Sequence, residues 1–127
     1  MIVLDASVLI AYLEPADPHH DRATELLIAA ADEAFGSSPL TLAQVLVGPA
    51  RAGKLPVAHA LLRRLEVAAV ALTDAAPERL AALRSSTRLR LPDCCVLLAA
   101  ETADAELATF DHRLAVTAEN LGLTVRS

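Results

Sequence analysis

Aromatic residues are scarce in this chain of 127 residues: they make up 2% of it, and tryptophan is absent. Because 54% of the residues are nevertheless hydrophobic, the core must be built mainly from Ala, Leu and Val. A chain of this length is expected to form one domain, residues 1–127. Folding buries about two-thirds of the surface of such a chain, so the core needs no disulfide or zinc ion to hold it together.

Cysteine is also rare, and the two that occur, Cys94 and Cys95, are adjacent. A disulfide between neighbours would be strained, whereas a free cysteine packs well in a core, so we expect both thiols to be buried. No cluster of His and Cys has the spacing of a zinc site. We interpret His19-His20-Asp21 as a loop-to-helix junction, with Asp21 near the cap, rather than as a metal site.

No apolar run is long enough to cross a bilayer, and uncharged stretches such as 6–13 and 94–100 are far too short to do so. No basic segment precedes the first apolar run, and Asp5 interrupts that run early, so we expect no signal peptide, no membrane contact and a cytoplasmic protein. The net charge of −5 argues against a general polyanion binder. A nucleic-acid partner would require cations or a local patch of arginines.

The rest of the chain alternates between short apolar runs and amphipathic segments. Strands are expected at 2–5, 34–37, 67–72, 107–110 and 123–126, and helices at 7–13, 21–31, 57–65, 74–88, 92–103 and 111–120. A further helix begins at Ser38-Pro39, which is a strong start signal, and should kink or break at Gly48-Pro49. We expect 67–72 to be a buried strand. Strands separated by helices predict an α/β/α sandwich with a largely parallel central sheet.

Three aspartates stand at the ends of apolar runs that lie far apart in the chain. Asp5 closes Met-Ile-Val-Leu-Asp, Asp93 follows Leu-Arg-Leu-Pro, and Asp111 follows Leu-Ala-Thr-Phe. In an open α/β sheet, ligand-binding groups lie at the carboxyl ends of the strands; Asp5 and Asp111 fall there, and so does Asp93 if its helix begins at that edge. Helix capping explains Asp93 and Asp111 singly, but not Asp5.

Several carboxylates at one edge would repel each other unless a cation lay between them. Oxygen ligands suit hard cations, so the sequence predicts a Mg²⁺ or Mn²⁺ site formed by Asp5, Asp93 and Asp111. Such an ion on a phosphodiester would activate water and stabilise the leaving oxygen. Metal-assisted phosphodiester hydrolysis is therefore the leading reaction class.

Gln44 stands where a fourth acid would be expected. Thr41, Gln44, Gly48 and Arg51 share one helical face by their spacing, and this polar stripe is either solvated or turned toward the acidic cleft. His112, next to Asp111, is a candidate for contact with substrate or product. Candidates for phosphate contacts, for each of which a solvated helix surface is the simpler interpretation, are Arg51, Arg113, Arg84, Arg88 and Arg90.

These segments together resemble the PIN-domain toxins of the VapC family, the ribonuclease half of VapBC toxin–antitoxin modules. The matching pieces are 2–13, 38–46, 91–94 and 108–114, in family order and spacing, and they run nearly from end to end. The resemblance implies a Mg²⁺- or Mn²⁺-dependent endoribonuclease that cuts structured RNA of the tRNA or rRNA class and inhibits translation and growth. It also implies a VapB-like antitoxin as partner and a homodimer.

Carried over residue by residue, Asp5, Gln44, Asp93 and Asp111 take the catalytic positions, while Ser7 and Thr109 match small polar positions. Gln44 departs from the family pattern, which has Glu there. Glutamine keeps the shape and a carbonyl ligand but lacks the charge, so metal binding and orientation of the attacking water would weaken. The protein is a naturally attenuated nuclease, a toxin whose Glu was changed to permit expression, or an enzyme for which three aspartates suffice.

Two other classes compete with a nuclease. A phosphoacceptor receiver domain also clusters acids but needs a lysine late in the chain, and the single lysine is Lys54. A catalytically inactive PIN-like binding module, in which the cleft survives as a docking surface for a VapB-like antitoxin, is the alternative that Gln44 favours. An RNA cleavage assay with added metal separates these classes.

Overall fold

The computed structural model describes residues 1–127 and has a five-stranded sheet at its centre. The strands are β1 (Ile2–Leu4), β2 (Phe35–Ser37), β3 (Ala68–Ala69), β4 (Glu106–Ala108) and β5 (Val125–Arg126). The helices are α1 (Ala6–Leu13), α2 (His20–Ala29), α3 (Pro39–Arg51), α4 (Leu55–Arg64), α5 (Ala76–Ser86), α6 (Leu91–Ala103) and α7 (His112–Asn120). All neighbouring strands are parallel, in the order β3-β2-β1-β4-β5, which confirms the predicted α/β class.

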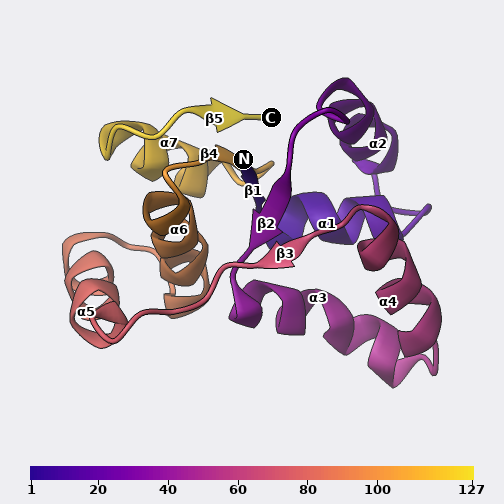
Figure 1. The fold of residues 1–127 in the computed structure, drawn as a ribbon, viewed down its shortest axis with the longest axis horizontal. Helices are drawn as coiled ribbons and strands as arrows, with labels where there is room; N and C mark the ends of the chain where they lie inside the picture. Colours follow the sequence, from indigo (N-terminus) through magenta and orange to yellow (C-terminus); the bar gives the residue numbers. More distant parts are fainter.

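Strand β1 lies in the middle of the sheet and divides the core into two layers. Successive side chains of a strand point to opposite faces, so Ile2 and Leu4 join one buried cluster and Val3 joins the other. The first cluster takes its helical residues from α1 to α4, and the second takes them from α5 to α7. Figure 1 shows these two groups of helices on either side of the sheet.

The register of the sheet brings the carboxyl ends of β1 and β4 side by side. Leu4 pairs with Ala108, and the N–H of Asp5 donates to the carbonyl of Ala108 at 2.9 Å. Helix α6 precedes β4 in the chain and returns from the carboxyl edge of the sheet to the start of that strand, so its first turn lies at the carboxyl edge. Residues that follow β1 and β4, or that open α6, are therefore neighbours despite their separation in sequence.

The helix that was expected to kink or break at Gly48-Pro49 continues to Arg51. Its start follows the prediction, because the Ser38 side chain accepts a hydrogen bond from the N–H of Leu40 and Pro39 occupies the first turn. Because the helix continues to Arg51, a break at Pro49 is ruled out. The preceding residue is Gly48, which has no Cβ for the proline ring to meet, and the helix ends soon afterwards.

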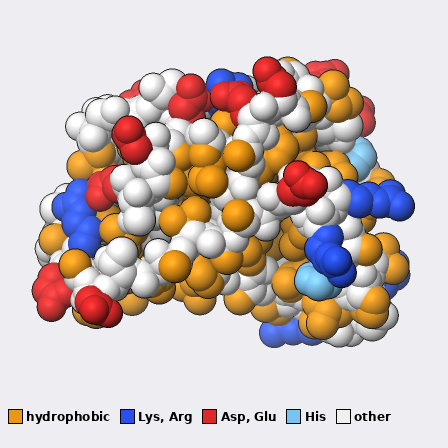
Figure 2. Space-filling model, in the orientation of Figure 1, with side chains coloured by type: hydrophobic (Ala, Val, Ile, Leu, Met, Phe, Trp, Pro, Cys, Tyr) orange, Lys and Arg blue, Asp and Glu red, His pale blue; other side chains and the backbone are white.

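The expectation of a buried strand at 67–72 was also wrong. Only Ala68 and Ala69 pair with β2, and both are exposed at the edge of the sheet. Leu72 beyond them is 47% exposed, and Figure 2 shows hydrophobic side chains across the centre of this face. None of the seven helices combines the length and the apolar character needed to cross a membrane.

Candidate active site

Asp5 is the most buried of the three predicted acids, at 7% exposure. It precedes α1, yet its side chain makes no capping hydrogen bond to that helix. Instead, its Oδ2 accepts hydrogen bonds from the hydroxyls of Ser7 and Thr109, both at 2.8 Å. Burying a carboxylate is costly unless hydrogen bonds compensate, so these two hydroxyls hold the charge and fix its direction.

The same two hydroxyls also hold the chain that leads to Asp111. Ser7 Oγ accepts from the N–H of Phe110 at 3.0 Å, and Thr109 Oγ1 accepts from the N–H of Asp111 at 3.0 Å. Each hydroxyl thus donates to Asp5 and accepts from the turn after β4. The carboxylate of Asp5 and the backbone of Asp111 are positioned by one network.

Asp111 caps α7, as the simpler interpretation of this residue predicts. Its Oδ1 accepts from the N–H of Leu114 at 3.1 Å, and the residue is exposed. A negative charge at this end of a helix is also favoured by the helix dipole. Capping occupies one carboxylate oxygen and leaves Oδ2 without a hydrogen bond.

Asp93 lies in the first turn of α6, half-buried, and its Oδ2 accepts from the N–H of Arg90 at 3.3 Å. Burial raises the pKa of this carboxyl above its usual value, and repulsion by Asp5 and Asp111 raises it further, although the hydrogen bond from Arg90 opposes both. Asp93 therefore lies near enough to Asp5 and Asp111 to be influenced by their charges, although the three are distant in sequence. All three stand at the same edge of the sheet.

The donor chemistry of this edge suits a hard cation. Each carboxylate has one oxygen held by the protein and one, Asp5 Oδ1, Asp93 Oδ1 or Asp111 Oδ2, with no protein hydrogen bond. As the side chains stand, no group of three His, Cys, Asp or Glu residues is arranged to hold a metal ion. Binding at this edge would require the acids to close on the ion, whose positive charge would offset their mutual repulsion.

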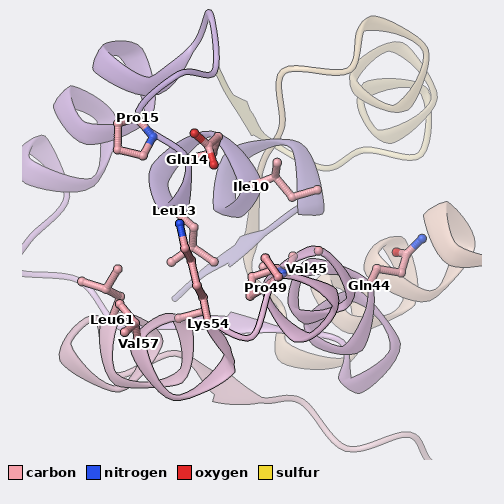
Figure 3. Close-up of a pocket in the computed structure, with 13 residues that line it drawn as sticks. Ile10, Leu13, Glu14, Pro15, Gln44, Val45, Pro49, Lys54, Val57 and Leu61 are labelled. Carbon is pink, nitrogen blue, oxygen red and sulfur yellow. The ribbon is translucent and has the colours of Figure 1, made fainter.

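Gln44 is exposed on α3 and makes no side-chain hydrogen bond. In Figure 3 its side chain points away from the apolar residues around Val45. One turn earlier, Thr41 is buried, and its hydroxyl is the one buried side-chain polar atom without a hydrogen-bond partner. The polar stripe predicted on this face is therefore split, with Thr41 inside and Gln44, Gly48 and Arg51 in solvent.

A contact that the sequence analysis missed lies beside Asp111. The Phe110 ring has the guanidinium of Arg22 4.6 Å from its centroid and the His19 ring at 5.4 Å, tilted by 45°. The start of α2 is thereby packed against the turn that carries Asp111. The sequence signal was the position of one of only three aromatic residues next to a predicted site acid.

The predicted loop-to-helix junction at His19-His20-Asp21 is confirmed. His19 is the N-cap residue of α2, Asp21 lies in its first turn, and a His20 ring nitrogen lies 2.8 Å from the carbonyl oxygen of Ala11. Cys94 and Cys95 are buried free thiols in α6, as expected. Burial raises the pKa of both thiols.

An apolar groove of about 660 Å³ lies between α1, α3 and α4. Ile10 and Leu13 line one wall, Val45 and Pro49 another, and Leu61 the third. Figure 3 shows Glu14 and Lys54 at its margin, so an apolar floor is bordered by one charge of each sign. Gln44 lies at one end of the groove.

The chain matches the family model described as PIN domain over residues 2–120. A search of curated protein sequences finds no significant match. The structure resembles a toxin–antitoxin complex from Klebsiella pneumoniae, with a TM-score of 0.80, 22% identity and coverage of 100% of this chain and 97% of that one.

Two further solved structures are similar. VapBC2 from Rickettsia felis, bound to a DNA fragment from its promoter, has a TM-score of 0.70, 18% identity and coverage of 99% and 98%. VapC20 from Mycobacterium tuberculosis, a toxin that cleaves the sarcin-ricin loop, has a TM-score of 0.70, 17% identity and coverage of 92% and 95%. At these identities the likeness establishes the fold.

Proposed function

The chain belongs to the PIN-domain family, whose fold it shares with VapC toxins and toxin–antitoxin complexes, and we propose that it is a metal-dependent endoribonuclease of the VapC type. One observation carries the proposal: Asp5 and Asp111 follow the neighbouring strands β1 and β4, and Asp93 lies in the first turn of α6, so that all three stand at the carboxyl edge of the sheet. Like charges gathered at an exposed edge are costly without a cation to share.

Asp5, Asp93 and Asp111 would hold Mg²⁺ or Mn²⁺ through their oxygens that lack protein hydrogen bonds. When bound, such an ion lowers the pKa of a water molecule and stabilises the leaving oxygen of a phosphodiester. Ser7 and Thr109 fix the direction of the Asp5 carboxylate, because both donate to its Oδ2. The backbone bond from Arg90 holds Asp93 in the first turn of α6.

Gln44 completes the proposed catalytic set with Asp5, Asp93 and Asp111. Its amide can accept or donate a hydrogen bond to water but cannot take a proton from it, so a residue of this type orients the nucleophile without activating it. The three interpretations of this residue stay open: a naturally attenuated enzyme, a toxin changed to permit expression, or a site for which three aspartates suffice. All three predict activity below that of the Gln44→Glu variant or equal to it.

The proposed substrate is structured RNA of the tRNA or rRNA class, cut in the cytoplasm so that translation and growth are inhibited. The sarcin-ricin loop cleaved by the similar VapC20 is one such RNA. The proposed partners are a VapB-like antitoxin and a second copy of the chain. Support for an antitoxin comes from two similar structures described as a toxin–antitoxin complex and as VapBC2.

We place the antitoxin contact in the apolar groove between α1, α3 and α4. An amphipathic segment buries its apolar side in such a groove and leaves polar residues at the rim, where Glu14 and Lys54 offer both charges. Gln44 lines the end of this groove, so a bound antitoxin chain would lie near the catalytic edge.

The second candidate is a catalytically inactive PIN-like binding module that docks a VapB-like antitoxin. The neutral side chain of Gln44 favours it, because the cleft then lacks the fourth carboxylate. Such a module would bind an antitoxin without cleaving RNA.

The deciding experiment incubates the chain with tRNA and rRNA in Mn²⁺ and in EDTA. We expect cleavage only with Mn²⁺, and its loss in Asp5→Asn, which keeps the shape of the side chain but halves its acceptor capacity. Asp32→Asn is the matched control, because Asp32 is exposed and makes no hydrogen bond. Cleavage that survives in EDTA or in Asp5→Asn would contradict the proposal. Absence of cleavage in both the native chain and Gln44→Glu would favour the binding module.

A further inference from the structure

A second cavity, of about 790 Å³, lies between α7 and the segment that joins α5 to α6. Its polar lining comes from Ser85, Ser86, Thr87 and Arg88 on one side and from His112, Arg113, Thr117 and Asn120 on the other. No Asp or Glu lines it. We call this cavity the arginine pocket.

The charge of the arginine pocket is opposite to that of the whole protein. The chain carries a net charge of −5, yet Arg88 and Arg113 are both exposed and neither takes part in an ion pair. The three salt bridges of the structure use Arg79 and Arg126 instead. Figure 2 shows Lys and Arg side chains at the edge of the molecule between the positions of α5 and α7. Two unpaired guanidinium groups at one cavity favour an anionic occupant.

The arginine pocket adjoins the carboxyl edge of the sheet that carries Asp5, Asp93 and Asp111, which we call the acidic edge. His112 follows Asp111 directly, and Arg88 lies two residues before Arg90, whose N–H binds Asp93. His112 and Arg113 are the first two residues of α7, and their N–H groups make no hydrogen bond within the chain. Two backbone donors at the start of α7 are therefore free beside the two arginines.

We infer that the arginine pocket binds a backbone phosphate of the RNA strand that is cut at the acidic edge, an inference that rests on the proposed function. An edge of three carboxylates repels a polyanion, so the strand needs a positive anchor close by. Arginine presents a fork of donors that matches phosphate, and hydroxyl and amide side chains commonly bind phosphate and sugar oxygens. The lining of the arginine pocket supplies both kinds of group. It thereby positions the strand without reading its bases.

The test measures the affinity of a fluorescein-labelled single-stranded RNA by fluorescence anisotropy at several salt concentrations. EDTA is present, so that cleavage does not interfere. We expect Arg88→Gln and Arg113→Gln each to weaken binding by about tenfold at low salt. Each should also reduce the slope of log K against log salt by about 0.7 for every phosphate that the variant no longer binds. Both arginines are exposed and unpaired, so the variants should unfold at the same temperature as the native chain.

Arg63→Gln is the matched control, because Arg63 is exposed and unpaired near the end of α4, away from the arginine pocket. It should leave affinity and salt slope unchanged. Arg113→Lys, which keeps the charge but not the fork, should recover part of the affinity. If the native chain also cleaves RNA, the two Gln variants should raise KM more than they lower kcat.

Two results would overturn the inference: native RNA affinity and salt slope in both variants, or no measurable RNA binding by the native chain in EDTA at low salt. A loss of affinity for an acidic antitoxin peptide without a loss for RNA would also overturn it, since the arginine pocket would then be a protein-binding site. A native chain that binds RNA through Arg88 and Arg113 but never cleaves it would refute the proposed function and leave the arginine pocket standing.

Discussion

The hydroxyl of Thr109 lies 2.8 Å from Oδ2 of Asp5 and joins two residues 104 positions apart in the chain. Asp5 follows the central strand, and Thr109 follows the neighbouring strand β4. One hydrogen bond therefore connects a nearly buried charge to the turn that carries Asp111. Its loss should affect both stability and the geometry of the acidic edge.

Thr109→Val keeps the shape of the side chain and removes the hydroxyl. We expect the free energy of unfolding to fall by about 1–3 kcal/mol, because Asp5 loses a charge-assisted donor and the N–H of Asp111 loses its acceptor. Urea denaturation measures the change. Thr24→Val is the control, since its hydroxyl binds only the carbonyl of His20 within α2. An equal loss in both variants would show that the network around Asp5 has no special role.

Gln44→Glu restores a carboxylate at the proposed fourth catalytic position. We expect Mn²⁺-dependent RNA cleavage to rise by about tenfold or more, because a carboxylate can both attract the ion and accept a proton from water. Initial rates over a Mn²⁺ titration measure the effect. Ala43→Glu places the same charge on the neighbouring exposed position and should not reproduce it. Unchanged rate and metal affinity in Gln44→Glu would contradict the role assigned to this residue.

Asp93→Asn should stabilise the metal-free protein at neutral pH. The pKa of Asp93 is raised in the folded state, so protonation of this carboxyl stabilises the fold. That contribution is fully present below the ordinary aspartate pKa of about 3.9. It is lost as the pH rises through the raised pKa of the folded state. Asparagine removes that loss and can still accept from the N–H of Arg90.

Urea midpoints measured in EDTA at neutral and at mildly acidic pH test this prediction. The advantage of Asp93→Asn over the native chain should shrink as the pH falls, while Asp32→Asn should show no such trend. Added Mn²⁺ should stabilise the native chain more than Asp93→Asn, because an ion bound only by the folded state shifts the unfolding equilibrium. A variant less stable than the native chain at neutral pH would disprove the account of Asp93.

Pro49→Ala should raise the free energy of unfolding by about 1 kcal/mol. Alanine restores a backbone donor inside α3, although the proline ring also loses its contacts in the apolar groove. Pro39→Ala is the comparison, because Pro39 lies in the first turn, where a missing N–H costs nothing. Thermal unfolding followed by circular dichroism distinguishes the two, and equal shifts would contradict the explanation.

Neither cysteine should react with an aromatic disulfide reagent while the protein is folded. Burial raises the pKa of both thiols, so the reactive thiolate is rare at neutral pH and is shielded from the reagent. The same protein in urea should release two equivalents, one for each thiol. Fast reaction of the folded chain would show that α6 opens more readily than its burial indicates.

The alternation of strands and helices and the start of α3 could be predicted because their signals are local. Ser38 and Pro39 define a helix start from adjacent residues, and α3 begins there. The run at 67–72 shows where such signals fail, because its apolar residues resemble a buried strand although β3 lies exposed at the sheet edge. Strand order, which decides exposure, is set by contacts between distant segments.

In the candidate site, too, features with a local sequence signal could be predicted and contacts between distant residues could not. The position of Asp5 after an apolar strand was predictable, and so was the absence of a simple capping role, which the structure bears out. The bond from Thr109 to Asp5 and the packing of Arg22 on Phe110 join residues without any shared local pattern. Hydrophobic periodicity reports which face of an element is buried and carries no information about such partners.

The distance along the chain between Asp5 and Thr109 has a consequence during translation. At about 5–20 residues per second, the ribosome takes on the order of 5 to 20 seconds to advance from one to the other. Throughout that interval β1 lacks its partner β4, and the nascent chain has neither the donor to Asp5 nor Asp111 itself. The residues of the proposed nuclease centre can therefore come together only after Thr109 and Asp111 have been synthesised.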